Sequence, residues 1–231
     1  LCADGRLTIP RTVAMNGTPN FKLDSGATLV IDGDLKPYAS SGNVGFANLN
    51  NGLIDVRGLA DARSHTAGLI FFATSKSSGI LKTRGFVSSS SSADAARFVP
   101  NSNGENGKWI IGESGISGTG QIYIQSNRSV TIYPSSDYSI NRSLQGNNSG
   151  TYTLATTDYD DSAIGRTVTV NAAISAGKVA VSGSGRVLFN ATGGTTQGLT
   201  ANDSATIAVN AGKQPCKGAV TMNGTSTLKV A

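Results

Sequence analysis

The sequence is poor in charged and aromatic residues and contains a single histidine. Charged residues make up 14% of the 231 residues and aromatic residues 6%, whereas charged residues alone reach roughly 25% in a typical globular domain. Helical periodicity is almost missing, and the stretch most compatible with a helix, residues 92–98, is too short and too rich in serine to nucleate one. These scarcities argue against an ordinary compact enzyme and against a helical fold.

Basic residues exceed acidic residues but form no patch. The net charge is +5 and the isoelectric point is about 9.3, a balance that would suit a polyanionic partner. The lysines and arginines are scattered, however, and the longest cluster is the pair of Lys82 and Arg84. Because no basic stripe is interleaved with aromatic residues, we expect no nucleic-acid partner and interpret the charge as a solubility feature.

Cysteines and long apolar runs are also scarce. Cys2 and Cys216 lie near opposite ends of the chain, and in an elongated stack they would be too far apart for a disulfide bond. Two cysteines cannot build a disulfide framework or a zinc site, and no apolar run approaches the length of a membrane span. We therefore expect no cofactor, no metal centre and no membrane insertion by this segment.

Short alternating apolar runs, bounded by glycine, asparagine, aspartate or serine, fill the chain and predict short strands. In the last third, apolar pairs recur every twenty residues or so, at Val168/Val170, Val187/Phe189, Ile207/Val209 and Leu228/Val230. A second series is interleaved at the same spacing, at Val179/Val181, Leu199 and Val220/Met222. Two strand positions that repeat in phase indicate a coil stacked on itself. We predict an all-β fold, a right-handed parallel β-helix (solenoid) with loop insertions, spanning residues 1–231 as a single domain with its clearest repeats at 165–231.

Polar corners accompany these repeats. Asp24-Ser25 and Asp203-Ser204 precede their strands in the same way, and Asn171, Asn190 and Asn210 each follow a strand, which suggests a stacked asparagine ladder. A nucleophile at Ser25 with His65 as its base is an alternative, but a corner role explains both Asp-Ser pairs. The regular spacing of the apolar runs is interrupted at about 84–108 and 134–165, where we predict insertions that loop away from the coil.

Two groups of residues are candidates for a site. Six aromatic residues suit stacking on sugar faces, or equally the filling of a core: Trp109, Tyr123, Tyr133, Tyr138, Tyr152 and Tyr159. Three acids, Asp158, Asp160 and Asp161, form either a weak cation site or a solvated loop. Asp32 and Asp34 with Lys36, and Asp55 with Arg57, are further charged clusters. We expect no catalytic residue among them.

Residues 183–196 read Gly-Ser-Gly-Arg-Val-Leu-Phe-Asn-Ala-Thr-Gly-Gly-Thr-Thr and resemble the autotransporter-associated β-strand repeat. In that family a Gly-x-Gly strand is followed by a Gly-Gly-Thr turn and by a strand that ends in Asn-Ala-Gly, as residues 205–212 do here. The resemblance covers the last third of the chain and, in part, residues 23–33, whereas the middle departs from it. It implies a β-helix in the passenger of a secreted or autotransported bacterial protein.

The resemblance leads us to expect a non-catalytic structural or adhesive passenger segment, secreted or on the exterior of the bacterial outer membrane. Its partners would be host or environmental glycans or surface proteins, and the open end coils could self-associate through their exposed β edges. The alternative is a carbohydrate-active β-helix protein, either lyase-like or glycan-binding, which would need acids clustered on one face.

Overall fold

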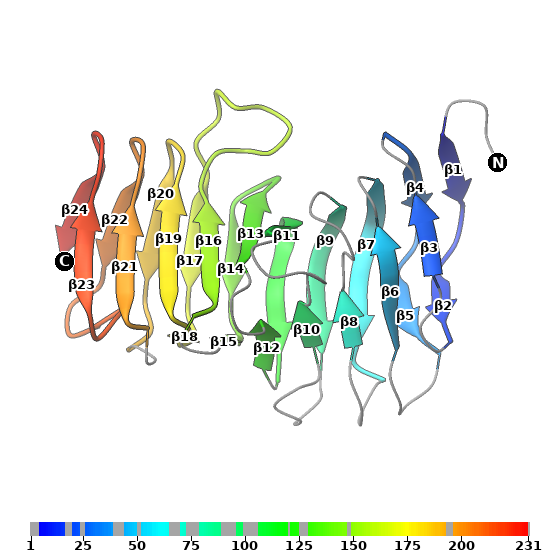
Figure 1. Ribbon diagram of the computed structural model, residues 1–231, viewed down its shortest axis with the longest axis horizontal. Coiled ribbons are helices and arrows are strands. Elements are labelled where there is room, and N and C mark those ends of the chain that lie inside the picture. Colours follow the sequence, from blue (N-terminus) through cyan, green and yellow to red (C-terminus); the bar gives the residue numbers. More distant parts are fainter. Residues whose placement is uncertain are drawn as a thin grey trace.

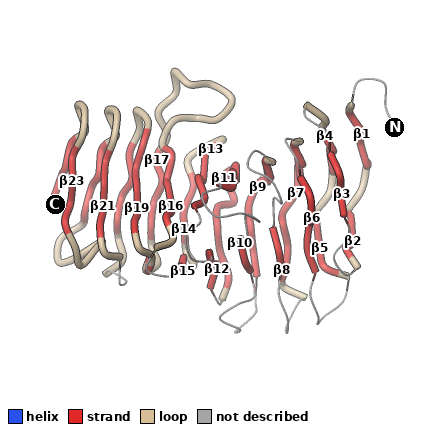
Figure 2. The backbone as a smooth tube through the Cα atoms, in the orientation of Figure 1, coloured by secondary structure: helices blue, strands red, loops and turns tan. Residues whose placement is uncertain are grey.

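A computed structural model confirms the predicted parallel β-helix (Figure 1). It describes residues 5–16, 20–23, 26–38, 44–49, 52–64, 70–72, 79–88, 96–98, 106–119, 121–124, 129–146, 149–192 and 196–230. Within these ranges the regular structure is strand and no helix occurs (Figure 2), so none could span a membrane. The chain winds as successive coils from the N-terminal end of the stack to the C-terminal end.

The strands lie on three faces of the stack, and in the described residues the last coils contribute to two of them. Face 1 is the parallel succession β1 (Arg6–Ile9), β4 (Thr28–Ile31), β7 (Leu53–Ala62), β9 (Ile80–Ser88), β11 (Asn106–Gly118), β13 (Ser129–Pro134), β16 (Thr151–Ala155), β19 (Lys178–Ser182), β21 (Gly198–Ala201) and β23 (Ala219–Met222). Every strand pairs in parallel with the strand of the next coil, which is the pairing that a β-helix requires.

Face 2 begins with β2 (Val13–Met15) and β5 (Leu35–Pro37) and continues through the second halves of β7, β9 and β11. It ends with β14 (Tyr138–Ile140), β17 (Thr167–Val170), β20 (Arg186–Phe189), β22 (Thr206–Val209) and β24 (Thr227–Val230). Because the three long strands belong to both faces, faces 1 and 2 form one 17-stranded sheet. The pairing register shifts where these strands turn the corner, between Val56 and Leu59 and between Ile111 and Gly115.

Face 3 is a separate 7-stranded sheet. It comprises β3 (Asn20–Leu23), β6 (Val44–Leu49), β8 (Ile70–Phe72), β10 (Ala96–Phe98), β12 (Gln121–Ile124), β15 (Ser143–Gly146) and β18 (Ile174–Ser175). In the described residues the coils after β18 carry strands on faces 1 and 2 alone, which makes them the shortest coils of the stack.

The predicted register in the last third is confirmed. Val187 pairs with Val168 on one side and with Ile207 on the other, and Ile207 pairs with Leu228. The interleaved series is in register on face 1, where Leu199 lies between Val179 and Val220. Along these strands, alternate residues such as Val187 and Phe189 point into a continuous apolar core, so like residues lie on top of like.

The predicted asparagine ladder is confirmed as well. Asn190 donates to Asn171 at 2.8 Å, and Asn210 donates to Asn190 at 2.6 Å. The ladder extends one coil further than the sequence indicated, because Asn171 donates to Asn141 at 2.7 Å. We call these four residues the asparagine ladder. A shorter second pair, Asn223 donating to Asn202 at 3.0 Å, follows the strands of face 1.

Asp203 lies at a stacked corner, as the repeat pattern predicted. Its backbone adopts a positive φ of 60°, and Gly183 and Gly224 also have positive φ, at 101° and 63°. The Asp203 carboxylate accepts the backbone N–H of Gly183 at 3.0 Å, while its carbonyl accepts the N–H of Thr225 at 2.8 Å. An aspartate side chain that bonds to backbone amides is a common way to hold this left-handed geometry. Asp24, Ser25, His65 and Cys2 lie outside the described residues.

Strands run through much of the two predicted insertions. In 134–165, β14, β15 and β16 pair in parallel with the adjacent coils, and the segment after β16 leaves the stack (Figure 1). We call residues 156–166 the β16–β17 loop. In 84–108, β9 runs to Ser88, β10 belongs to face 3, and β11 begins at Asn106.

Candidate functional site: a groove at the corner between faces 1 and 2

Three of the six candidate aromatic residues fill the core. Trp109 and Tyr152 are 0% exposed and Tyr138 is 4% exposed. The ring of Trp109 packs edge-on against Phe86 at 5.5 Å, and the Tyr152 hydroxyl lies 2.7 Å from the carbonyl oxygen of Gln145. Burial raises the pKa of both Tyr138 and Tyr152. These rings stabilise the coil from within and cannot stack on a ligand outside it.

The other three aromatic residues are more accessible. Tyr123 is partly buried on face 3. Tyr133 and Tyr159 contact each other edge-on, with ring centroids 5.2 Å apart, and Tyr159 is 38% exposed. The structure thus brings together two of the predicted aromatic residues, from the end of β13 and from the β16–β17 loop.

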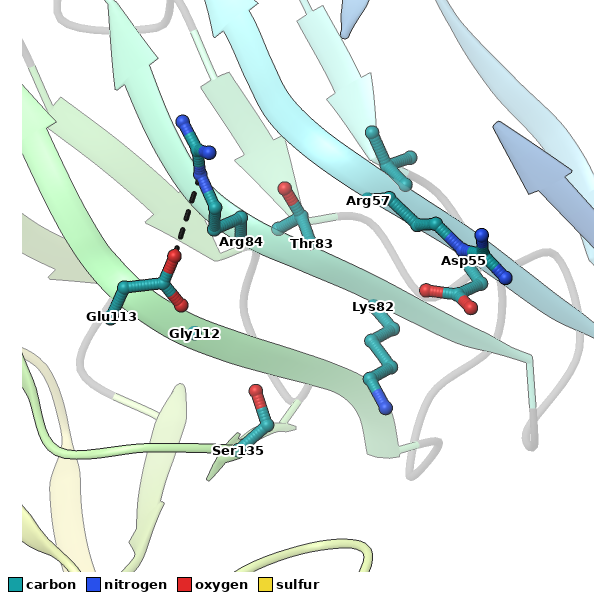
Figure 3. Close-up of a pocket in the computed structure, with 9 residues that line it drawn as sticks. Asp55, Arg57, Lys82, Thr83, Arg84, Gly112, Glu113 and Ser135 are labelled. Atoms are coloured by element: carbon teal, nitrogen blue, oxygen red, sulfur yellow. Dashed lines mark ion pairs between the residues drawn. The ribbon is translucent and has the colours of Figure 1, made fainter. Parts of the chain in front are cut away.

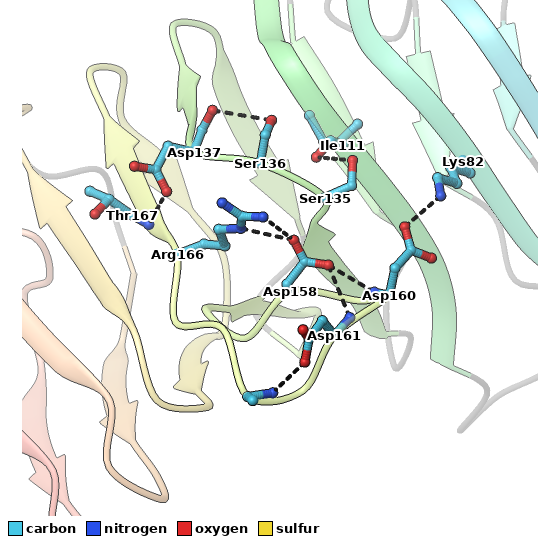
Figure 4. A network of polar contacts seen from close by, with 11 residues as sticks. Lys82, Ile111, Ser135, Ser136, Asp137, Asp158, Asp160, Asp161, Arg166 and Thr167 are labelled. Carbon is cyan, nitrogen blue, oxygen red and sulfur yellow. Dashed lines mark hydrogen bonds and ion pairs between the residues drawn. The ribbon is translucent and has the colours of Figure 1, made fainter.

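The three candidate acids hold the β16–β17 loop together (Figure 4). The Asp158 carboxylate accepts hydrogen bonds from Arg166 Nε at 2.8 Å and from the backbone N–H groups of Asp160 and Asp161. Burial raises the pKa of Asp158, but these hydrogen bonds and the Arg166 charge outweigh it and lower the pKa overall. Asp161 accepts the N–H of Ala163 at 3.0 Å.

These contacts leave the acids engaged with the chain itself. Within the described ranges, no group of three or more histidine, cysteine, aspartate or glutamate residues could hold a metal ion. Asp158 is 6% exposed, and its oxygens face Arg166 and the loop backbone. The arrangement is that of a structural ion pair in a turn.

The β16–β17 loop lies back across face 1. The backbone N–H of Tyr159 donates to the carbonyl oxygen of Pro134 at 2.9 Å. Asp160 forms an ion pair of 2.6 Å with Lys82, a residue 78 positions earlier in the chain. The loop therefore spans the coils of β13 and β11 to reach β9, a contact that no periodicity in the sequence could indicate.

A groove opens beside this contact, at the corner where β7, β9 and β11 pass from face 1 to face 2 (Figure 3). It encloses about 340 Å³. We call it the corner groove and define it by those polar lining residues that are not buried, Asp55, Arg57, Lys82, Arg84, Glu113 and Ser135. Successive coils contribute these side chains at the same corner, so they form a row along the stack.

The charges of the corner groove are paired, but loosely. Arg57 binds Asp32 at 2.9 Å, and Arg84 lies 3.5 Å from Glu113. Both arginine side chains are at least half exposed. Exposed pairs of this kind contribute only about 0–1 kcal/mol each, so water or a ligand can replace them at little cost.

A second charged cluster lies further along face 2. Arg63 donates to the buried Asp61 through its side chain and its backbone, and these bonds lower the pKa of Asp61 against the opposing effect of burial. Lys36 lies 3.4 Å from Asp34 and 3.7 Å from Asp61. The Asp34 carboxylate also accepts the backbone N–H of Leu59 at 2.9 Å. This cluster stabilises the bulged corner.

Comparison with protein-family models, with curated proteins and with solved structures finds no match for this chain. The fold and the corner groove therefore rest on the chain's own geometry.

Proposed function

We propose that the chain is a structural or adhesive passenger segment of an exported bacterial surface protein, a non-catalytic stalk that displays loops. The observation that carries the proposal is the in-register parallel stack, with a long loop fixed on its side by Lys82 and the backbone of Pro134. Arg166 holds this loop together from within. In this stack, like residues are buried on top of one another and asparagine amides are bonded to each other at the corners. Such an architecture gives a stable, elongated molecule.

The contacts of the carboxylates with shifted pKa values support a structural role. Asp61 and Asp158 are the aspartates whose pKa is lowered in the described structure, and both hold arginines and backbone N–H groups in turns. A lowered pKa keeps a carboxylate ionised near neutral pH, where it serves an ion pair and not proton transfer. Localisation outside the bacterial cell rests on the resemblance of residues 183–212 to autotransporter repeats.

Surface exposure and adhesion can be tested together. Intact cells of the source organism would be treated with an external protease and probed with an antibody against the chain. Beads coated with the chain would then be tested for attachment to glycan-coated and protein-coated surfaces. We expect loss of the antibody signal on intact cells and attachment above that of albumin-coated beads. A protease-resistant signal that is lost only after cell lysis would overturn the proposal.

A second candidate, a carbohydrate-active protein, is favoured by one observation, the corner groove with its mixture of arginines and carboxylates. Incubation of the chain with acidic polysaccharides separates the two functions. New reducing ends or unsaturated uronides would indicate a hydrolase or a lyase, and binding without turnover would support the adhesive function.

A further inference from the structure

The corner groove presents cations at the same corner of adjacent coils. Arg57 and Arg84 each follow a residue of one registered pair, Val56 and Thr83, so both side chains leave the sheet at the same corner. The backbones of adjacent strands are about 4.8 Å apart. The guanidinium of Arg57 turns to Asp32 of the preceding coil and that of Arg84 to Glu113 of the following coil, so the two cations lie more than one strand spacing apart along the groove. Figure 3 shows the two arginines projecting from neighbouring strands.

Two acidic groups and the hydroxyl of Ser135 share the lining of the groove with these cations. Asp55 pairs in register with Lys82 on the next strand, and Glu113 lies beside Arg84. A densely charged polyanion would place its charges against Asp55 and Glu113, which disfavours it. A ligand with one carboxylate and several hydroxyls per unit could instead satisfy the guanidinium groups and the carboxylates together.

An aromatic pair lies next along the same row of face 1. Asp55 pairs with Lys82, Lys82 with Ile110, and Ile110 with Tyr133. Tyr133 contacts Tyr159, whose neighbour Asp160 binds Lys82. The row therefore passes from charged groups through the buried Ile110 to the partly buried Tyr133. The exposed ring beside it is that of Tyr159, and such a ring offers an apolar face beside a polar edge.

We propose that the corner groove binds an acidic oligosaccharide whose sugar units carry single carboxylates. Arg57 and Arg84 pair with ligand carboxylates, Asp55, Glu113 and Ser135 accept or exchange hydrogen bonds with ligand hydroxyls, and Tyr159 borders the end of the site. The inference deepens the proposed adhesive function and rests on it, because it names the class of surface molecule that the stalk holds. Uronic acids and sialic acids share this chemistry.

Titration calorimetry of the full chain tests the proposal with four probes. Tetragalacturonate and its methyl ester form one pair, and sialyllactose and lactose form the other. Each pair differs by its carboxylates, and the two pairs distinguish the uronic from the sialic source. We expect at least one acidic probe to bind about tenfold more tightly than its neutral partner, the size expected for one charge-assisted hydrogen bond.

The double variant R57Q/R84Q should reduce that binding about tenfold or more, and its melting temperature should stay near that of the parent because the two ion pairs are exposed. The matched control is R6Q/R186Q, which removes the same charge from exposed residues of β1 and β20. The control should bind as the parent does. Equal binding of acidic and neutral probes, equal loss in both double variants, or no binding of any probe would each overturn the proposal.

Heparin serves as a fifth probe. Tighter binding of heparin than of both acidic oligosaccharides, with a steep dependence on salt, would indicate a general polyanion site and overturn the inference. The adhesion experiment remains separate. If the chain is exposed on cells and its beads attach to surfaces, but it binds no carboxylated sugar, the groove assignment is refuted and the adhesive function stands. If the chain binds an acidic sugar but is confined to the cell interior, the adhesive function is refuted and the groove assignment stands.

Discussion

The side-chain amide of Asn190 donates a hydrogen bond of 2.8 Å to the Oδ1 atom of Asn171 in the adjacent coil. At the same time its own Oδ1 accepts a hydrogen bond of 2.6 Å from Asn210. Asparagine suits this position because its amide carries a donor and an acceptor that can bond to identical groups on both sides. The asparagine ladder thus forms a continuous row of side-chain hydrogen bonds between coils, parallel to the backbone hydrogen bonds of the sheet.

Replacing Asn190 with alanine removes both side-chain bonds. We expect the free energy of unfolding to fall by about 1–3 kcal/mol, since each of the two bonds contributes about 0.5–1.5 kcal/mol. Urea denaturation followed by circular dichroism measures the change. The control is Asn16→Ala, because Asn16 occupies the same corner after β2 but the next coil carries Tyr38 there. Equal losses in the two variants would contradict a stabilising ladder.

The sequence predicted this ladder only where the coils are short. Steps of 19 and 20 residues separate its last three members, whereas 30 residues separate Asn141 from Asn171. The extra length is the β16–β17 loop, which conceals the repeat from any search at constant period. The sequence also does not reveal the corner at which β7, β9 and β11 pass from face 1 to face 2. Each of these strands passes through that corner at an irregularity in the pairing register, so no break between two strands marks it.

The candidate site was less accessible to prediction from sequence. The alternation of apolar and polar residues places Trp109, Tyr138 and Tyr152 on strands. It does not indicate which face of each strand points into the core. The ion pair between Lys82 and Asp160 joins residues from different coils, and it depends on where the loop falls back. The sequence identifies Asp55 and Arg57 as charged neighbours, whereas the groove that they line exists only once β9 and β11 have stacked beside them.

The ion pair of Asp158 and Arg166 should make stability depend on pH. The pKa of Asp158 in the folded chain lies below its ordinary value of 3.8. Its contribution is therefore complete above that value and is lost as the pH falls through the lower, folded pKa. We expect Asp158→Asn to cost about 2 kcal/mol at pH 6, as for a hydrogen bond to a charged group, and clearly less at pH 2.

Urea denaturation of the parent and of the Asp158→Asn variant at pH 6, 3 and 2 measures this dependence. The control is Asp161→Asn, which keeps the oxygen that accepts the Ala163 N–H at an exposed position. That variant should follow the parent at every pH. A difference between the parent and Asp158→Asn that stays constant from pH 6 to pH 2 would show that the carboxylate charge contributes nothing.

Gly185, the second glycine of the Gly-x-Gly segment, is required by backbone packing. A Cβ atom at this position would lie 2.2 Å from the carbonyl oxygen of Arg166 and 2.4 Å from that of Thr156. Both contacts are with backbone, which cannot move aside without shifting a coil. We expect Gly185→Ala to cost about 2–3 kcal/mol, as for an overpacked core.

Gly198→Ala is the matched control, since its Cβ would meet nothing closer than 3.8 Å, and it should be neutral or stabilising by about 0.5 kcal/mol. Thermal unfolding of the two variants compares them, and a neutral Gly185→Ala would refute the packing argument.

The value of a core residue should depend on its place in the stack. Ile207 is 0% exposed and lies between Val187 and Leu228, whereas Leu228 belongs to the terminal strand β24 and is 45% exposed. We expect Ile207→Ala to cost about 2–5 kcal/mol, because it leaves a cavity between two coils, and Leu228→Ala to cost less than about 1 kcal/mol. Urea denaturation measures both, and hydrogen exchange should show β24 opening before β20 in this chain, since β24 pairs with β22 alone among the described strands. Equal costs at the two positions would mean that Leu228 is covered in solution, and a molecular mass above that of one chain in sedimentation would then identify the cover as a second copy docked on the open coil.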